Sequence, residues 1–165
     1  MHGDAGIADA LWRDAFAAAK GEAGFAKLLV DAAGSPPPAF NWMGSLRTEQ
    51  GRIDLKKTGL FGIVSAARAL AICHNVVERS TPARLAGIKA LNLGMEADLD
   101  ALDEAHALFL DLILAQQIED AEHGRPPSNA VEVKRLTRRD RERLRTALRA
   151  VEPLETIVRD LLFKG

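Results

Sequence analysis

The sequence predicts an all-α protein, an up-and-down helical bundle that ends in a long antiparallel pair of helices. Apolar residues recur at helical spacing along most of the chain, and glycine, proline or capping residues separate these stretches. The last two predicted helices also carry opposite charges. With 165 residues, of which 47% are apolar and 27% charged, we expect residues 1–165 to form one helical domain.

The first sixty residues predict two helices and then an irregular stretch. Asp4 can cap a first helix that ends near Lys20, and a second is expected over residues 22–33, before the proline-rich stop at 34–38. The first helix should bury one stripe, formed by Ile7, Leu11, Ala15 and Ala18. Residues 39–60 lack helical periodicity and contain three glycines, so we expect an irregular segment or a short extended arm there.

Two shorter helices are predicted in the middle of the chain. The first covers residues 61–74 and should pack closely, because small residues dominate its inner face. That face carries Val64, Ala67, Leu70 and Ala71. Thr81 followed by Pro82 is typical of an N-cap with proline at the first helical position, so another helix should begin there and end near residues 92–94.

The chain should end in two long helices, over residues 96–123 and 138–163. The apolar face of the first carries Leu99, Leu102, His106, Phe109 and Ile113, and that of the second carries Leu144, Leu148, Val151, Leu154, Val158 and Leu161. Thr137 and Asp140 are spaced like a capping box at the start of the second. Pro153 should kink this helix or mark a join between two helices.

The charges of the two long helices predict how they are arranged. Residues 95–123 contain nine acids and no Lys or Arg, whereas residues 134–149 contain eight basic residues against two acids. Acids at a helix C-terminus and bases at a helix N-terminus both oppose the helix dipole. An antiparallel hairpin relieves both by placing the acidic end beside the basic end. The basic run has two interpretations: neutralisation within the molecule, or an anionic partner such as a nucleotide or RNA.

Composition excludes several classes of protein. Cys73 is the only cysteine, so a disulfide framework and a multi-cysteine metal site are excluded and a reduced, cytoplasmic setting is expected. No stretch is long and apolar enough for a membrane helix, and the start lacks a signal peptide, so we expect no membrane partner. No glycine-rich phosphate loop or calcium loop is present. Asp103 and His106 are interpreted as a helix-surface pair and not as half of a metal site.

A set of short motifs occurs in a fixed order along most of the chain. They are a G-x-I-D-L-K segment at 51–56, an A-R-x-L-A helix at 67–71, an S-T-x-x-R-L cap at 80–85, Gln117, P-x-N at 127–129 and a basic run at 136–144. This set resembles the helical substrate-binding domain that follows a CBS pair and a nucleotidyltransferase core in bacterial signalling proteins related to PII-protein uridylyltransferases. The resemblance implies an accessory domain of a signal-transduction protein.

The resemblance also implies what the chain lacks and what it works with. It should be inert as a catalyst alone, with no cofactor and no metal of its own, because the parent core supplies the Mg²⁺ and nucleoside triphosphate. That core and the CBS pair would lie upstream, so we expect the chain to be the C-terminal piece of a longer protein. Gly44-Ser45 followed by Arg52-Ile53-Asp54-Leu55 is similar to catalytic elements of nucleotidyltransferases. Arg52 replaces the first metal-binding aspartate, and no flanking strands are expected, so we reject this likeness.

The matched residues suggest a site. The candidate substrate-binding residues are Asp54, Lys56, Arg68, Thr81, Arg84 and Gln117. In one hypothesis Lys56, Arg68 and Arg84 place an anionic group of a nucleotide or acceptor protein beside the core, while Asp54 orients a guanidinium. In the other, Asp54 and the two arginines form a buried ion-pair network that ties the loop to the bundle.

Two functions of other classes remain open. Arg68 and His74 resemble the Arg and His element of small helical RNA-cleaving domains of the HEPN type, in which the histidine acts as general acid or base. Alternatively, the chain is a structural module that forms a homodimer. Its apolar patches near Phe40, Trp42 and Leu60-Phe61 would then cover a partner.

Overall fold

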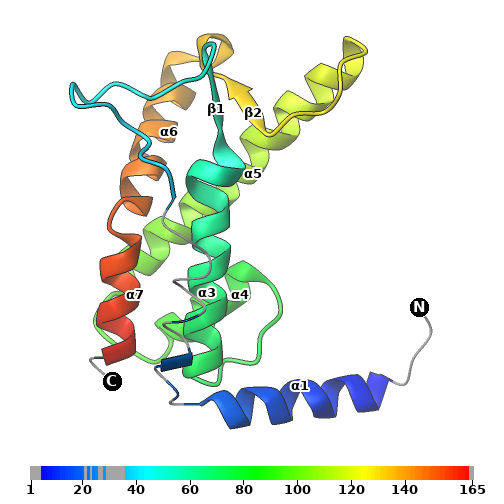
Figure 1. Cartoon of the computed structure of the whole chain (residues 1–165), viewed down its shortest axis with the longest axis vertical. Coiled ribbons are helices and arrows are strands. Elements are labelled where there is room, and N and C mark those ends of the chain that lie inside the picture. The colour runs from blue at the N-terminus through cyan, green and yellow to red at the C-terminus, as the bar shows by residue number, and fades with distance from the viewer. Residues whose placement is uncertain (1–4, 21, 23, 26–27, 29–35, 164–165) are drawn as a thin grey trace.

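The computed structural model describes residues 5–20, 22, 24–25, 28 and 36–163, and it is an all-α bundle, as predicted (Figure 1). Its elements are α1 (Ala5–Ala19), β1 (Arg52–Asp54), a π-helical turn (Lys56–Leu60), α3 (Phe61–Cys73), α4 (Thr81–Lys89), α5 (Glu96–Glu122), β2 (Ala130–Glu132), a 3₁₀ turn (Val133–Arg135), α6 (Arg138–Val151) and α7 (Leu154–Phe163). Most of the predicted second helix, 22–33, lies outside the described residues.

Helix α3 is the central helix of the bundle and packs against α4, α7 and α1. Its buried face is rich in alanine, as the sequence predicted, and side chains this small let neighbouring helices approach closely. The π-helical turn continues directly into α3, and there Gly59 lies against the ring of Phe109 in α5. Phe109 is fully buried, so this contact joins the two longest helical segments at the centre of the core.

Helices α5 and α6 form the predicted antiparallel pair (Figure 1). Near the end of α5, Glu119 forms an ion pair with Arg135, which lies just before α6. The predicted capping interaction is present, since Thr137 Oγ1 accepts a hydrogen bond from the backbone N–H of Asp140 at 3.1 Å. The predicted join is also confirmed, because the helix stops after Val151 and α7 begins at Leu154, on either side of Pro153.

Neutralisation of the basic run by α5 is limited. Among the described residues, Arg135 is the only member of the run 134–149 that forms an ion pair with α5. Two further ion pairs lie within α6, from Arg138 to Glu142 and from Arg143 to Asp140. The guanidinium groups of Arg145 and Arg149 lie 5.7 Å from the ring centre of Phe40. Arg139 forms no ion pair with the described residues, so a surplus of positive charge remains on α6.

The predicted buried stripe of the first helix is wrong. The side chains of Ile7 and Leu11 are 70% and 69% exposed, and Ala15 and Ala18 are exposed as well. Helix α1 instead contacts the bundle through Phe16, which is 3% exposed, and Trp12, whose Nε1–H donates to the carbonyl of Val77 at 2.9 Å. The reason is size: alanines give the predicted stripe little surface to bury, whereas the two aromatic rings, four residues apart, dominate the contact.

Two local predictions also need correction. The N-cap of α4 is Ser80 and not Thr81, because the Ser80 backbone is extended and its Oγ accepts a hydrogen bond from the N–H of Ala83 at 3.3 Å. Thr81 is the first helical residue, and α4 ends earlier than expected, at Lys89. The expected short extended arm is confirmed as strand β1, which pairs antiparallel with β2 in the register Ile53↔Val131. Residues 56–60, expected to be irregular, instead form the π-helical turn. Three-residue strands are too short to show an alternating pattern in the sequence.

The apolar patches proposed for self-association differ in exposure. The side chain of Trp42 is 92% exposed and that of Phe61 51%, whereas Phe40 is partly buried. Three further apolar side chains at four-residue spacing, Leu110, Leu114 and Ile118, are about half exposed on α5. Among the described residues, no helix combines the length and hydropathy that a membrane span requires.

Candidate functional site

The structure divides the six predicted site residues between two places. Asp54, Lys56 and Gln117 lie near the β1–β2 ladder, whereas Arg68 lies within α3 and Thr81 and Arg84 lie in the first turn of α4 (Figure 1). Twelve helical residues separate Lys56 from Arg68, which corresponds to a rise of roughly 18 Å. One substrate group therefore cannot contact all six.

Near the ladder, Asp54 interacts with residues close to it in the sequence. Its carboxylate accepts a hydrogen bond from the N–H of Lys57 at 3.1 Å and lies 3.6 Å from the Nζ of the same residue. It forms no ion pair with Arg68 or Arg84, so the predicted network of Asp54 with the two arginines is not formed and Asp54 does not orient a guanidinium. Lys56 is exposed, and Gln117 Nε2 donates to Asn129 Oδ1 at 3.1 Å.

The strongest polar network in the described part of the chain surrounds Asp120, which sequence reasoning missed. Asp120 is 1% exposed, and its carboxylate accepts hydrogen bonds from Gln116 Nε2 at 3.0 Å and from the N–H of Ser128 at 3.2 Å. Arg125 Nε lies 3.3 Å and Arg52 3.9 Å from the same carboxylate. Both carboxylate oxygens have partners within the chain, so we assign Asp120 a structural role and not a ligand-binding one. The network holds the β-ladder and the loop before β2 against α5.

A signal for this network was present in the sequence. Gln116 lies three residues after Ile113, and Asp120 lies four residues after Gln116. Both therefore continue the apolar face of the helix, but with polar side chains. Polar residues on a buried face need partners, and the nearby Arg125 and the backbone of the following loop supply them.

The second group contains Arg68 of α3 and Arg84 of α4, whose positive charges influence each other. Arg84 is 6% exposed, and its Nε donates to the carbonyl of Glu78 at 2.9 Å. Burial, and then the nearby positive charge of Arg68, lower the pKa of Arg84 below its usual range. Neither arginine forms an ion pair with a described carboxylate. Arg84 lies in the first turn of α4, where the helix dipole is also positive. Thr81, 8% exposed, lies in the same turn.

The two residues of the RNA-cleaving alternative, Arg68 and His74, lie in α3 and at its C-terminal end. Six residues of helix place their side chains about 120° apart around the axis of α3. His74 caps the end of α3, and its Nε2 lies 3.1 Å from the carbonyl oxygen of Leu161, which can only accept a hydrogen bond. This contact fixes the histidine against α7, away from Arg68.

The described residues offer no cluster of three His, Cys, Asp or Glu side chains that could hold a metal ion. His106 is buried and not on the helix surface, contrary to the sequence interpretation, because it lies on the inner side of α5 with Leu102 and Phe109. Burial lowers the pKa of its imidazole, and the negative charge of Asp103 opposes that shift.

Comparison with known proteins places the chain in a family. Residues 23–161 match the model of a family described as "putative nucleotidyltransferase substrate binding domain". No curated protein and no solved structure matches the chain. The match spans well over half of the chain. It begins after α1 and contains the elements from β1 to most of α7. The chain therefore belongs to the family of nucleotidyltransferase substrate-binding domains.

Proposed function

We propose that this domain binds the anionic group of a substrate for an attached nucleotidyltransferase core, in a signal-transduction protein related to PII-protein uridylyltransferases. The core and a CBS pair are its partners in the parent protein, and the core supplies the Mg²⁺, the nucleoside triphosphate and the catalytic carboxylates. The domain itself contributes positioning: it holds the substrate while the core transfers the nucleotidyl group. The substrate is a nucleotide or an acceptor protein.

The observation that carries this proposal is the arginine pair of Arg68 and Arg84. Burial of Arg84 without a carboxylate partner costs free energy, and the charge of Arg68 adds to that cost; both lower the pKa of Arg84, burial more than Arg68. A bound phosphate would offset it by accepting charge-assisted hydrogen bonds from both groups. The amino end of α4 adds a favourable dipole, and Thr81 lies in its first turn, one helical turn before Arg84.

The other three predicted residues take a separate role in this proposal. Asp54, Lys56 and Gln117 lie at the end of the molecule that carries the β-ladder, too far from Arg68 to share its ligand. Lys56 is exposed there and can meet a second part of an extended substrate or an acidic surface of the core. We assign the phosphate contact to Arg68 and Arg84 alone.

Binding of pyrophosphate and of UTP, measured by isothermal titration calorimetry, tests the proposal. Arg68→Ala removes one exposed guanidinium without touching the core, and we expect about tenfold weaker binding of both probes, since one charge-assisted hydrogen bond contributes about 1.5 kcal/mol or more. Arg47→Ala, which removes an equal charge from an exposed loop, should bind as the unchanged chain does. Equal affinity of the Arg68→Ala and Arg47→Ala variants would contradict the proposal.

A further inference from the structure

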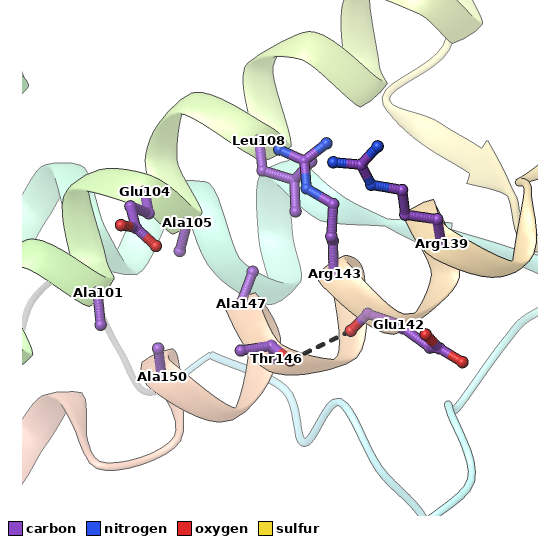
Figure 2. Close-up of a pocket in the computed structure, with 10 residues that line it drawn as sticks. All are labelled: Ala101, Glu104, Ala105, Leu108, Arg139, Glu142, Arg143, Thr146, Ala147 and Ala150. Carbon is purple, nitrogen blue, oxygen red and sulfur yellow. Dashed lines mark hydrogen bonds between the residues drawn. The ribbon is translucent and has the colours of Figure 1, made fainter.

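A groove of about 310 Å³ lies between α5 and α6, away from the six predicted site residues (Figure 2). Its sides are the facing surfaces of the two antiparallel helices. A volume of this size is at the lower end of the range for small-molecule sites. Three of its lining residues, Arg139, Glu142 and Arg143, belong to the basic run at 136–144, and none is among the six predicted site residues.

One end of the groove carries two arginines, and Glu142, which also lines the groove, is paired with Arg138. Figure 2 shows the guanidinium groups of Arg139 and Arg143 side by side, both directed from α6 towards Leu108 of α5. Arg139 forms no ion pair with the described residues, and Arg143 has only a 3.7 Å contact with Asp140, in which both side chains are partly exposed. Such an exposed contact contributes little, so both guanidinium groups remain free to bind an anion. They lie in the first turns of α6, at the positive end of its dipole.

The rest of the groove has a different character. Its floor consists of alanines from both helices, namely Ala101, Ala105, Ala147 and Ala150. The methyl groups of these alanines form an apolar surface against which the face of a planar ring can pack. At the opposite end from the arginines, Figure 2 shows the carboxylate of Glu104 beside Ala101 and Ala105. Glu104 forms no ion pair with the described residues, so its oxygens are free to accept N–H donors.

We propose that this groove binds a nucleoside monophosphate whose base carries an amino group. The phosphate binds Arg139 and Arg143 in the manner of guanidinium forks, the base lies on the alanine floor, and its amino group donates to Glu104. The three features occur in this order along one groove, which matches the order of phosphate, base ring and exocyclic amino group in such a nucleotide. A single nucleotide fits the enclosed volume, whereas an RNA strand would need a basic track that continues beyond it.

This inference does not rest on the substrate site at Arg68, and the experiment separates the two. AMP is titrated into the full chain by isothermal titration calorimetry, with UMP, adenosine and inorganic phosphate as comparison ligands. We expect AMP to bind more tightly than all three. Arg139→Ala should weaken AMP binding at least tenfold, and Glu104→Gln should weaken AMP binding while leaving UMP unchanged. Arg68→Ala should leave AMP binding unchanged.

The matched control is Arg141→Ala, which removes an equal charge from the same helix but from a side chain that does not line the groove. The circular dichroism spectrum and thermal midpoint of each variant confirm that it is folded, and since Arg139 and Glu104 are exposed, little change is expected. The proposal is overturned if AMP and inorganic phosphate bind equally, if Arg139→Ala binds AMP as Arg141→Ala does, or if a single-stranded RNA binds while AMP does not.

Discussion

Replacing Asp120 by alanine should lower the free energy of unfolding by about 3 kcal/mol, because it breaks a buried charge network. The carboxylate is the shared acceptor of Gln116 and of the Ser128 N–H, and it offsets the charges of Arg52 and Arg125. Both arginines are partly exposed, so water can solvate their guanidinium groups when the carboxylate is removed. The loss of unfolding free energy should therefore be at the lower end of the range for a broken buried ion pair. Urea unfolding followed by circular dichroism measures it.

Asp111→Ala is the control for this prediction. Asp111 lies on the same helix, is exposed and forms no ion pair with the described residues, so its removal should change the free energy of unfolding by less than about 0.5 kcal/mol. The Asp120→Asn variant should have a stability between those of Asp120→Ala and Asp111→Ala, since it keeps the size of the side chain but loses the charge. Equal stability of the Asp120→Ala and Asp111→Ala variants would show that the network does not hold the β-ladder to α5.

Gly59→Ala should destabilise the domain by a similar amount, for a steric reason. A Cβ at position 59 would lie 2.3 Å from Cε2 and 2.8 Å from Cζ of Phe109, far inside a normal contact distance. Phe109 is fully buried and cannot rotate into open space, so the π-helical turn or α5 must shift. Overpacking of this kind costs about 1–3 kcal/mol, and we expect the upper value. The measurement is the midpoint of chemical unfolding.

A second substitution makes this prediction specific. In Gly59→Ala with Phe109→Leu, the smaller side chain leaves room for the new methyl group, so the double variant should lose less stability than the sum of the two single losses. Gly24→Ala, where an added Cβ meets nothing within 4 Å, should show no loss. Strictly additive losses at positions 59 and 109 would contradict the steric explanation.

The helices could be predicted because each carries a strong local signal. The long apolar face from Leu99 to Ile113 fixed α5, and Pro153 fixed the division between α6 and α7. The exposed face of α1 could not be predicted, because choosing between an alanine stripe and two aromatic rings requires knowing what α1 packs against. The same is true of β1 and β2, whose paired residues Ile53 and Val131 are 78 positions apart in the sequence, so no local signal shows the pairing.

The candidate site was predictable only in part. The sequence suggested Arg68 and Arg84 as candidate site residues, but it wrongly joined them to Asp54, since spacing along a chain does not show which side chains lie within ion-pair distance. It identified the basic run of the last long helix without showing that Arg139 and Arg143 face a groove. That groove depends on which alanines of α5 and α6 meet, a property of helix packing and not of either helix alone.

The measurement that tests the substrate-binding role most directly is an NMR titration of the ¹⁵N-labelled chain with UTP. We predict saturable shifts of the amide signals around Arg68 in α3 and in the first turn of α4, including Thr81 and Arg84, and their loss in the Arg68→Ala variant. Binding that shifts only amides outside these two segments, or no saturable shift at millimolar UTP, would contradict the assignment of the anion site.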